Sequence, residues 1–149
     1  MGKSREQRKE IMLEANILEA LDHPYILSYR ECYENKMEML CIVTEYCEKG
    51  TLEDEIQRRK GDWYKGIAPQ YFDNMEVLTL FTHILLAVKH LHNRKIIHRD
   101  LKAENIFVME NGELKVGDFG TSLQLNPTDK QCMTVIGQKQ YISPEIFDH

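Results

Sequence analysis

The sequence predicts an α+β fold in a chain that has the length of one domain. Two long segments carry apolar residues at helical spacing, and several shorter segments have the apolar, extended character of β-strands. An Asn-Gly pair between two of these strands is a strong signal for a β-hairpin, because both residues tolerate a positive φ. With 149 residues, of which 42% are hydrophobic, the chain can bury a core.

The first part of the chain is predicted to be a helix followed by two strands. Residues 4–21 have an apolar stripe at helical spacing, and Asp22-His23-Pro24 ends the helix because proline disfavours a helical residue before it. Extended runs follow at 26–33 and 39–46, separated by the polar turn at 34–36. The apolar stripe of the helix consists of Ile11, Ala15, Leu18 and Leu21.

The middle of the chain is predicted to contain two helices joined by a loop. Thr51 and Asp54 have the spacing of a helix cap, for a short helix that ends near Arg59. The loop at 60–73 carries glycine and proline, and the helix at Met75–Asn93 follows it. That helix is apolar around most of its circumference, so we expect it to be buried against several neighbours.

Charge and cysteine content exclude several classes of protein. The net charge of −5, without a basic stripe, argues against a nucleic-acid surface. The four cysteines lie far apart and form no CxxC pair, which favours reduced thiols over disulfides or a zinc site. No segment resembles a signal peptide or a membrane span, so we expect a soluble, cytoplasmic protein that does not bind membranes.

Polar residues flank the predicted hairpin, whose strands are expected at 106–109 and 114–116. If Asn111-Gly112 is a two-residue turn, Asn105 and Asp118 are cross-strand partners at the open end, with Cβ atoms on the order of 5 Å apart. Their oxygens suit one hard divalent cation. The loop that follows a short strand at 96–97 then brings a further carboxylate, that of Asp100, towards the same cation. Lys102, two residues on, can reach a phosphoryl group and offset its charge.

From Leu13 to Glu145 the chain resembles the eukaryotic protein kinases, and its motifs are most similar to those of the NIMA-related serine/threonine kinases. The matching segments are HPYILSYRECYEN, LCIVTEYCEKGTL, IIHRDLKAENIFV, KVGDFG and GQKQYISPE. The resemblance implies a bilobal kinase-like fold that is incomplete, with residues 1–149 as a partial kinase domain. Residues 1–46 would be the later part of the N-terminal lobe, and 47–149 the hinge and the first part of the C-terminal lobe.

The resemblance also implies roles for individual residues. Asp100 accepts the proton of the substrate hydroxyl, and Lys102 stabilises the transferring phosphoryl group. Asn105 and Asp118 ligate Mg²⁺, which binds together with ATP. Glu14 pairs with the lysine that positions the nucleotide. Thr44 is the gatekeeper, and the hinge from Glu45 to Cys47 receives adenine through backbone groups. The side chains expected to stack between the lobes are those of Leu18, Tyr29, His98 and Phe119.

Two further residues are expected to regulate activity. Arg99 precedes the catalytic aspartate, which in this family indicates control by phosphorylation of the activation loop. Thr134, three residues before Gly137, matches the usual site, and its phosphate would pair with the Arg99 guanidinium. Gln138 replaces the threonine that usually follows this glycine, which puts the geometry of the substrate loop in doubt.

The sequence differs from a whole kinase domain in one important respect. Gly2 is the only glycine before Glu14, so a glycine-rich phosphate loop and its strand lysine are absent, and the chain stops before the large helices of the lower lobe. We therefore expect an ATP- and Mg²⁺-dependent enzyme that phosphorylates serine or threonine in protein substrates, present here as a fragment that is inactive alone and prone to aggregate. The alternatives are a non-catalytic, kinase-derived regulator that binds proteins, and a metal-binding hairpin without kinase chemistry.

Overall fold

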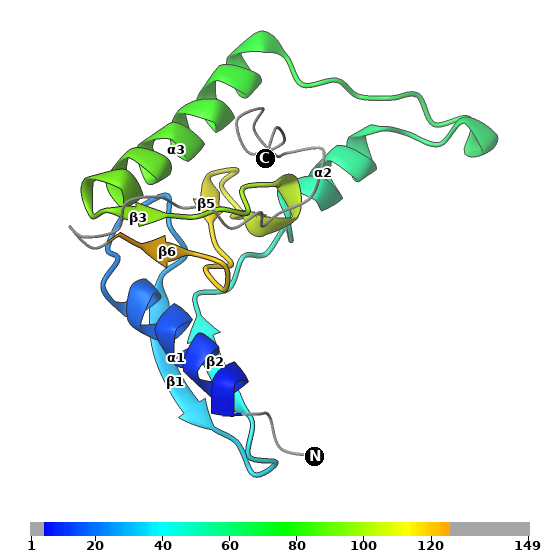
Figure 1. The fold of residues 1–149 in the computed structure, drawn as a ribbon. Helices are drawn as coiled ribbons and strands as arrows, with labels where there is room; N and C mark the ends of the chain where they lie inside the picture. Colours follow the sequence, from blue (N-terminus) through cyan, green and yellow to red (C-terminus); the bar gives the residue numbers. More distant parts are fainter. Residues whose placement is uncertain (1–4, 126–149) are drawn as a thin grey trace, which may run out of the picture.

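The computed structural model describes residues 5–125, which form three α-helices, six strands and two 3-10 turns (Figure 1). The predicted mixture of helices and strands is confirmed. In chain order the elements are α1 (Arg5–Glu19), β1 (Tyr29–Glu34), β2 (Leu40–Thr44), α2 (Leu52–Arg59), η1 (Trp63–Lys65), α3 (Asn74–Asn93), β3 (Ile96–Ile97), η2 (Ala103–Asn105), β4 (Ile106–Val108), β5 (Leu114–Val116) and β6 (Leu123–Gln124).

Three two-stranded antiparallel ribbons organise the chain: β1–β2, β3–β6 and β4–β5. In Figure 1, α1 lies along the β1–β2 ribbon in the lower part of the molecule. The upper part contains α3, which packs on β3 and β5, and α2, which contacts β4. The segment between α2 and α3 extends away from both. The pairing of β6 with β3 was not predicted, since the sequence from Thr121 onward is mostly polar.

Local sequence signals account for the ends of the helices. Thr51 and Asp54 form the predicted capping box of α2: the Thr51 hydroxyl accepts from Asp54 N–H, and the Asp54 carboxylate accepts from Thr51 N–H. Asp73 and Glu76 make the same exchange at the start of α3. Each box satisfies two backbone donors that a helix start would leave unpaired, so both helices begin at fixed residues.

One apolar core joins the upper and lower parts. The predicted stripe of α1 is buried at Ala15 and Leu18, and Leu21 just beyond the helix is buried with it. These side chains and those of Ile26, Val116 and Phe119 belong to the core, which reaches Ala87 and Leu91 on α3. The core therefore fixes the position of β5, and of the residues that follow it, relative to α1.

The prediction that α3 is buried on several sides is wrong for the part of the chain that the structure describes. Only His83, Ala87 and Leu91 of this helix are buried. The opposite face exposes apolar side chains, among them Leu78 at 58% and Phe81 at 55%.

The predicted register of the hairpin is also wrong, by one residue. Ile106 pairs with Val116, and Gly117 N–H donates to Asn105 O at 3.0 Å, so the partner of Asn105 is Gly117 rather than Asp118. The turn has three residues, 110–112. A type I′ turn needs positive φ at both central residues, but here only Gly112 has one, at 84°, and the Asn111 side chain instead accepts from Glu113 N–H.

Candidate active site

Three predicted catalytic side chains meet in one hydrogen-bonded group beside the open end of the β4–β5 hairpin. The Lys102 ammonium lies 2.8 Å from Asp100 Oδ2, and Asn105 Nδ2 donates to the same oxygen at 2.9 Å. Asn105 Nδ2 also donates to the Asp100 backbone carbonyl at 2.9 Å. Two donors therefore hold Oδ2, and the other carboxylate oxygen, Oδ1, is left to accept a hydrogen bond from a ligand.

The short turn η2 explains why these residues meet. Asn105 N–H donates to Lys102 O at 3.0 Å, which closes the turn and places the buried Asn105 side chain back towards Asp100. The hydrogen bond to Asp100 raises the pKa of Lys102, with smaller contributions from the charges of Glu104 and Asp118. The lysine is thus held in its charged form, and Asp118 lies within electrostatic reach of it.

The buried His98 side chain holds the loop that carries Asp100 and Lys102. It is 2% exposed, and its Nδ1 accepts from Asp100 N–H, so the proton is on Nε2, which donates to Gly117 O at 2.9 Å. Burial lowers the pKa of His98, although the bond to Gly117 and the charges of Asp118 and Asp100 oppose this. A neutral histidine therefore connects the loop before Asp100 to the segment before Asp118.

Asp118 and Glu14 form a second group around Gly120. A Cβ atom placed on Gly120 would lie 3.4 Å from Asp118 Oδ1 and 3.5 Å from Glu14 Oε2, so both carboxylates border this glycine. Burial raises the pKa of Glu14, and the charge of Asp118 raises it further. Asp118 has a φ of 57°, a left-handed conformation that turns the chain out of the β5 strand direction. This turn, rather than cross-strand pairing, sets the direction of the Asp118 side chain.

The carboxylates of Glu14 and Asp118 repel each other, and a cation between them would relieve this repulsion. Among the side chains that the structure describes, which begin at Arg8, no lysine or arginine forms an ion pair with Glu14. A half-buried carboxylate with a raised pKa is favoured as an anion only when a cation approaches it. The predicted pairing of Glu14 with a lysine remains a prediction.

The predicted hinge lies between β2 and α2. Glu45 N–H donates to Ser28 O, while Thr44 Oγ1 donates to Glu45 O. Cys47 O accepts from Gly50 N–H, but within the described residues the Cys47 N–H has no acceptor. That N–H is one backbone group of the hinge that a ligand could use.

Lys115 is a residue that the sequence analysis missed. Its ammonium lies 2.9 Å from Glu45 Oε1 and 2.9 Å from Pro24 O, with side chains of Lys115 and Glu45 only 10% and 14% exposed. Burial opposes the charge of Glu45, but the bonds from Lys115 and Ser28 together hold its pKa below the usual range. A lysine in the centre of the apolar strand LKV was the available signal, since a buried lysine needs a partner.

Arg99 and the predicted interlobe stack are also placed. Arg99 Nε donates to Thr121 O at 2.6 Å, which ties the catalytic loop to the segment after Gly120. Leu18 and Phe119 belong to one core cluster, against which Tyr29 packs, and the His98 and Phe119 rings lie 5.0 Å apart. Their role as a stack between two lobes stays a prediction. The predicted phosphorylation site Thr134 and the substituted position Gln138 lie outside the described residues.

Comparison with known proteins decides the family. The family model described as protein kinase domain matches residues 1–149. The chain belongs to the protein kinase family. Its predicted similarity to the NIMA-related serine/threonine kinases is confirmed as well, because the relatives below are Nek serine/threonine-protein kinases.

Three relatives illustrate the similarity. The chain is 39% identical over 146 residues to serine/threonine-protein kinase Nek1 of Mus musculus, and 39% identical over 137 residues to serine/threonine-protein kinase Nek11 of Homo sapiens. It is 35% identical over 136 residues to Nek3 of Mus musculus. These matches cover 98%, 92% and 91% of the chain but 11%, 20% and 25% of the relatives. The chain therefore spans at most about a quarter of their length.

The kinase family generally uses ATP and Mg²⁺, and the donor atoms of this chain fit the metal. Because Asn105 Nδ2 is committed to Asp100, the amide oxygen Oδ1 is the group left for a cation, and Asp118 is exposed and offers carboxylate oxygens. Magnesium bound with nucleotide takes only one or two protein ligands. In the part of the chain described, no three His, Cys, Asp or Glu side chains gather as a metal site, and no helix is long and apolar enough to cross a membrane.

Proposed function

We propose that this chain carries the phosphotransfer centre of an ATP- and Mg²⁺-dependent serine/threonine protein kinase. The observation that supports this most directly is the group formed by Asp100, Lys102 and Asn105. Fixing a carboxylate by two donors on one oxygen orients the other oxygen, and positioning of this kind is most of what phosphoryl transfer requires of a protein.

Each residue then has a distinct task. Asp100 Oδ1 accepts the proton of a serine or threonine hydroxyl, while the Lys102 ammonium, 2.8 Å from Oδ2, offsets charge on the transferring group. Asn105 Oδ1 and the carboxylate of Asp118 would hold Mg²⁺, which would offset the charge of the ATP phosphates. The Cys47 N–H and the Glu45 carbonyl, which accepts from Thr44 Oγ1, are the hinge groups that would receive adenine.

The domain division belongs to this proposal. Residues 1–46 would be the part of the upper lobe that contains α1, β1 and β2, and residues 47–149 the hinge and the part of the lower lobe with the catalytic loop. The arrangement of α1 on the β1–β2 ribbon, apart from α2 and α3, supports the division (Figure 1). The Arg99 side chain, which donates to Thr121 O, would also form an ion pair with a phosphate group on Thr134.

We infer that the 149-residue chain alone does not transfer phosphate, because the sequence supplies no lysine to Glu14 from a strand that follows a glycine-rich loop. The test is therefore a chimaera in which this chain replaces the matching segment of mouse Nek1. We expect the chimaera to phosphorylate a protein substrate, and Asp100→Asn to lower the rate by about 10²- to 10⁴-fold.

A matched control is Asp62→Asn, which removes a carboxylate from the exposed loop between α2 and α3 and should leave the rate unchanged within about twofold. A chimaera that folds and binds ATP but transfers no phosphate would contradict the proposal. So would a folded Asp100→Asn variant with full activity.

A second candidate is a non-catalytic, kinase-derived module that binds proteins. It is favoured by the unpaired position of Glu14 within the described chain and by the exposed apolar side chains of α3. Thermal unfolding of the Nek1 chimaera with and without ATP and Mg²⁺ separates the two, because a ligand raises the melting temperature only if its site forms. A rise supports a kinase site in this chain, whereas an unchanged melting temperature favours the binding module.

A further inference from the structure

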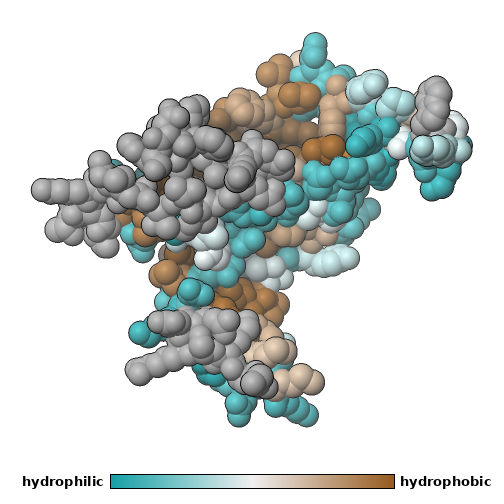
Figure 2. All heavy atoms as spheres, turned by 45° about the vertical axis from the view of Figure 1, so that its right-hand side comes forward, coloured by the Kyte–Doolittle hydropathy of each residue, from teal (hydrophilic) through white to brown (hydrophobic). Residues whose placement is uncertain are grey.

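Lys115 is a buried charged residue that the proposed phosphotransfer does not use. It lies in the middle of β5, three residues before Asp118, and is only 8% exposed. Charged side chains normally lie at the surface, as the hydrophilic patches in Figure 2 illustrate. Burying an ammonium group costs free energy unless the group is paired, so the contacts that Lys115 makes decide what it does.

The Lys115 ammonium joins the hinge to the loop between α1 and β1. It lies 2.9 Å from Glu45 Oε1 and donates to Pro24 O, also at 2.9 Å. The same carboxylate oxygen accepts from Ser28 N–H at 2.7 Å. Two donors from different segments therefore hold one oxygen of Glu45, which leaves its carboxylate little freedom to move.

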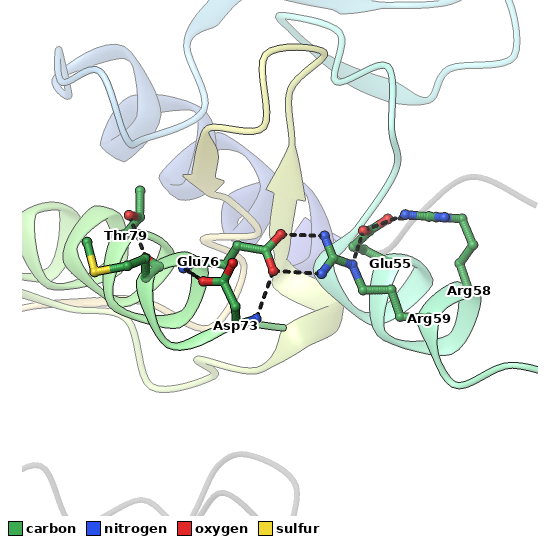
Figure 3. A network of polar contacts seen from close by, with 7 residues as sticks. Glu55, Arg58, Arg59, Asp73, Glu76 and Thr79 are labelled. Atoms are coloured by element: carbon green, nitrogen blue, oxygen red, sulfur yellow. Dashed lines mark hydrogen bonds and ion pairs between the residues drawn. The ribbon is translucent and has the colours of Figure 1, made fainter. Parts of the chain in front are cut away.

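The Lys115–Glu45 ion pair is more buried than the other close contacts between charged residues of distant elements. Arg59 and Glu76, for example, join α2 to α3, and their side chains are 20% and 41% exposed (Figure 3). The side chains of Lys115 and Glu45 are 10% and 14% exposed. Water and salt therefore screen this pair less, so it restrains its two residues more strongly than a surface pair does.

The loop between α1 and β1 does not need Lys115 for its own position. Val116 N–H donates to Tyr25 O and Leu27 N–H donates to Val116 O, both at 2.9 Å, and these backbone bonds fix the loop on β5. What Lys115 adds is the position of Glu45. Without the ammonium, the Glu45 carboxylate would be a buried anion without a cation, so it would turn towards water and move the hinge with it.

Glu45 belongs to the hinge, and its backbone carbonyl is one of the groups that would receive adenine. A carbonyl accepts hydrogen bonds, and the donor on adenine is its 6-amino group. Such a bond weakens steeply when its angle departs from the preferred range, so a shift of Glu45 would weaken this contact first. The triphosphate, near Asp118, would be affected less.

We propose that Lys115 is a positioning residue that makes the hinge selective for adenine. It holds the Glu45 side chain and thereby fixes the Glu45 carbonyl at the distance and angle that the 6-amino group needs. Lys115 acts through Glu45 and need not touch the nucleotide. This inference rests on the proposed phosphotransfer function and adds to it a residue that sets the nucleotide preference.

The nucleotide preference of the Nek1 chimaera tests this. ATP is compared with purine riboside 5′-triphosphate, which lacks only the 6-amino group. In the unchanged chimaera we expect kcat/KM to be about tenfold higher for ATP, the effect of one good hydrogen bond. In Lys115→Met the preference should fall to about threefold or less, through a higher KM for ATP with little change in kcat.

Two control variants separate positioning from a general loss of stability. Leu91→Ala removes a core side chain of α3 that is 1% exposed, so it should lower the melting temperature to a similar degree but leave the preference for ATP unchanged. Lys49→Met removes an exposed lysine close to the hinge that bonds the Glu110 carbonyl, and it should also leave the preference unchanged.

A double variant tests whether Lys115 acts through Glu45. In Glu45→Gln the side chain can still accept from Ser28 N–H but no longer forms an ion pair, so the preference for ATP should also fall. If the two residues act as one unit, Lys115→Met combined with Glu45→Gln should lose no more of the preference than the larger single loss. Losses that multiply in the double variant would contradict an action through Glu45.

Hydrogen exchange without nucleotide gives a readout that does not depend on catalysis. Glu45 N–H donates to Ser28 O at 2.9 Å, and Val116 N–H serves as a reference in β5. In the chimaera, Lys115→Met should speed exchange of Glu45 N–H at least about tenfold more than that of Val116 N–H. Leu91→Ala should speed both to a similar degree, because it acts on the whole core.

These measurements distinguish a failure of the inference from a failure of the proposed function. An active chimaera in which Lys115→Met keeps the full preference for ATP would overturn the inference and leave the function standing. An equal loss of preference in Leu91→Ala would overturn it as well. A chimaera without phosphotransfer contradicts the function. In that case equal exchange at Glu45 and Val116 would also overturn the positioning by Lys115, whereas faster exchange at Glu45 would support it.

Discussion

The two ends of the β4–β5 hairpin have different chemistry, although both strands between them are largely buried. At the open end, the Asn105 side chain donates to the Asp100 carbonyl, and the Asn105 carbonyl accepts from Gly117 N–H, so the polar side chain is held on a fixed backbone. At the turn end, Val108 and Leu114 form the wall of an apolar cavity with a charged rim. A short, buried hairpin thus holds a polar site and an apolar site at a constant separation, and each can change without the other.

The largest expected effect is a loss of phosphotransfer when the polar site at the open end is disrupted. Asn105→Ala removes both hydrogen bonds to Asp100, so phosphotransfer by the Nek1 chimaera should fall by about 10²-fold, since misplacing a reacting group costs about that much. A steady-state assay of this variant measures the effect, and an unchanged rate would show that the Asn105 side chain does not position Asp100.

The next effect concerns the strand between the two ends. Lys115→Met leaves the Glu45 carboxylate 14% exposed without its cation, so the free energy of unfolding should fall by about 3 kcal/mol, the low end for a broken buried pair. Lys49→Met removes an exposed lysine that bonds only the Glu110 carbonyl and should cost less than about 0.5 kcal/mol. Urea denaturation measures both, and equal losses would refute the role of the buried pair.

Adding Glu45→Gln to Lys115→Met should recover part of the lost stability, since the second change removes the unpaired charge. The double variant therefore distinguishes a charge effect from a packing effect. If the double variant is less stable than Lys115→Met by the full cost of both changes, the loss is one of packing.

A smaller effect is expected on stability when the pH falls and His98, beside the open end, becomes protonated. Burial lowers the pKa of His98 below its ordinary value of 6.5, so the unfolded chain binds more protons than the folded one between these two values. Stability from His98 is complete above about pH 6.5 and is lost as the pH falls through that window. The raised pKa of Glu14 acts in the opposite direction. Melting temperatures at about pH 7.5 and 5.5 should differ less in His98→Gln than in the unchanged chain.

The smallest expected effect lies at the turn end. Arg59→Lys replaces a guanidinium that binds Glu76 through two parallel hydrogen bonds, which one ammonium group does not reproduce, so the melting temperature should fall slightly. Arg58 is more exposed and contacts only Glu55, so Arg58→Lys should cost less than Arg59→Lys. Thermal unfolding compares the two variants. An equal change in melting temperature would mean that the paired bonds from Arg59 to Glu76 stabilise the fold no more than the surface pair of Arg58.

Local signals in the sequence predicted the helices well. Thr51 and Asp54 marked the start of α2, because a capping box acts on its immediate neighbours. The first helix ends at Glu19, two residues before the predicted end at residue 21, so Pro24 limits this helix without setting its last residue. Three predicted site residues, Asp100, Lys102 and Asn105, also meet, although the expected pairing of Asn105 with Asp118 does not occur. Their contact depends on a turn of a few residues, which a short stretch of sequence determines.

Features that depend on the exact turn or on distant partners were not predictable. The Asn-Gly signal gives a hairpin but does not choose between a two-residue and a three-residue turn, and one extra residue moved the partner of Asn105 to Gly117. The pairing of Lys115 with Glu45 joins residues far apart in the chain, as does that of Arg59 with Glu76. Only the packing of α2, α3 and the hairpin brings such partners together.

The dependence of phosphotransfer on Mg²⁺ concentration tests the central claim most directly. In the Nek1 chimaera, Asp118→Asn removes a proposed metal ligand, so the Mg²⁺ concentration for half-maximal rate should rise about tenfold or more. Asp100→Asn removes the proton acceptor, so it should lower the maximal rate and leave that concentration unchanged. An Asp118→Asn variant with the Mg²⁺ dependence of the unchanged chimaera, or an equal shift in both variants, would contradict the account.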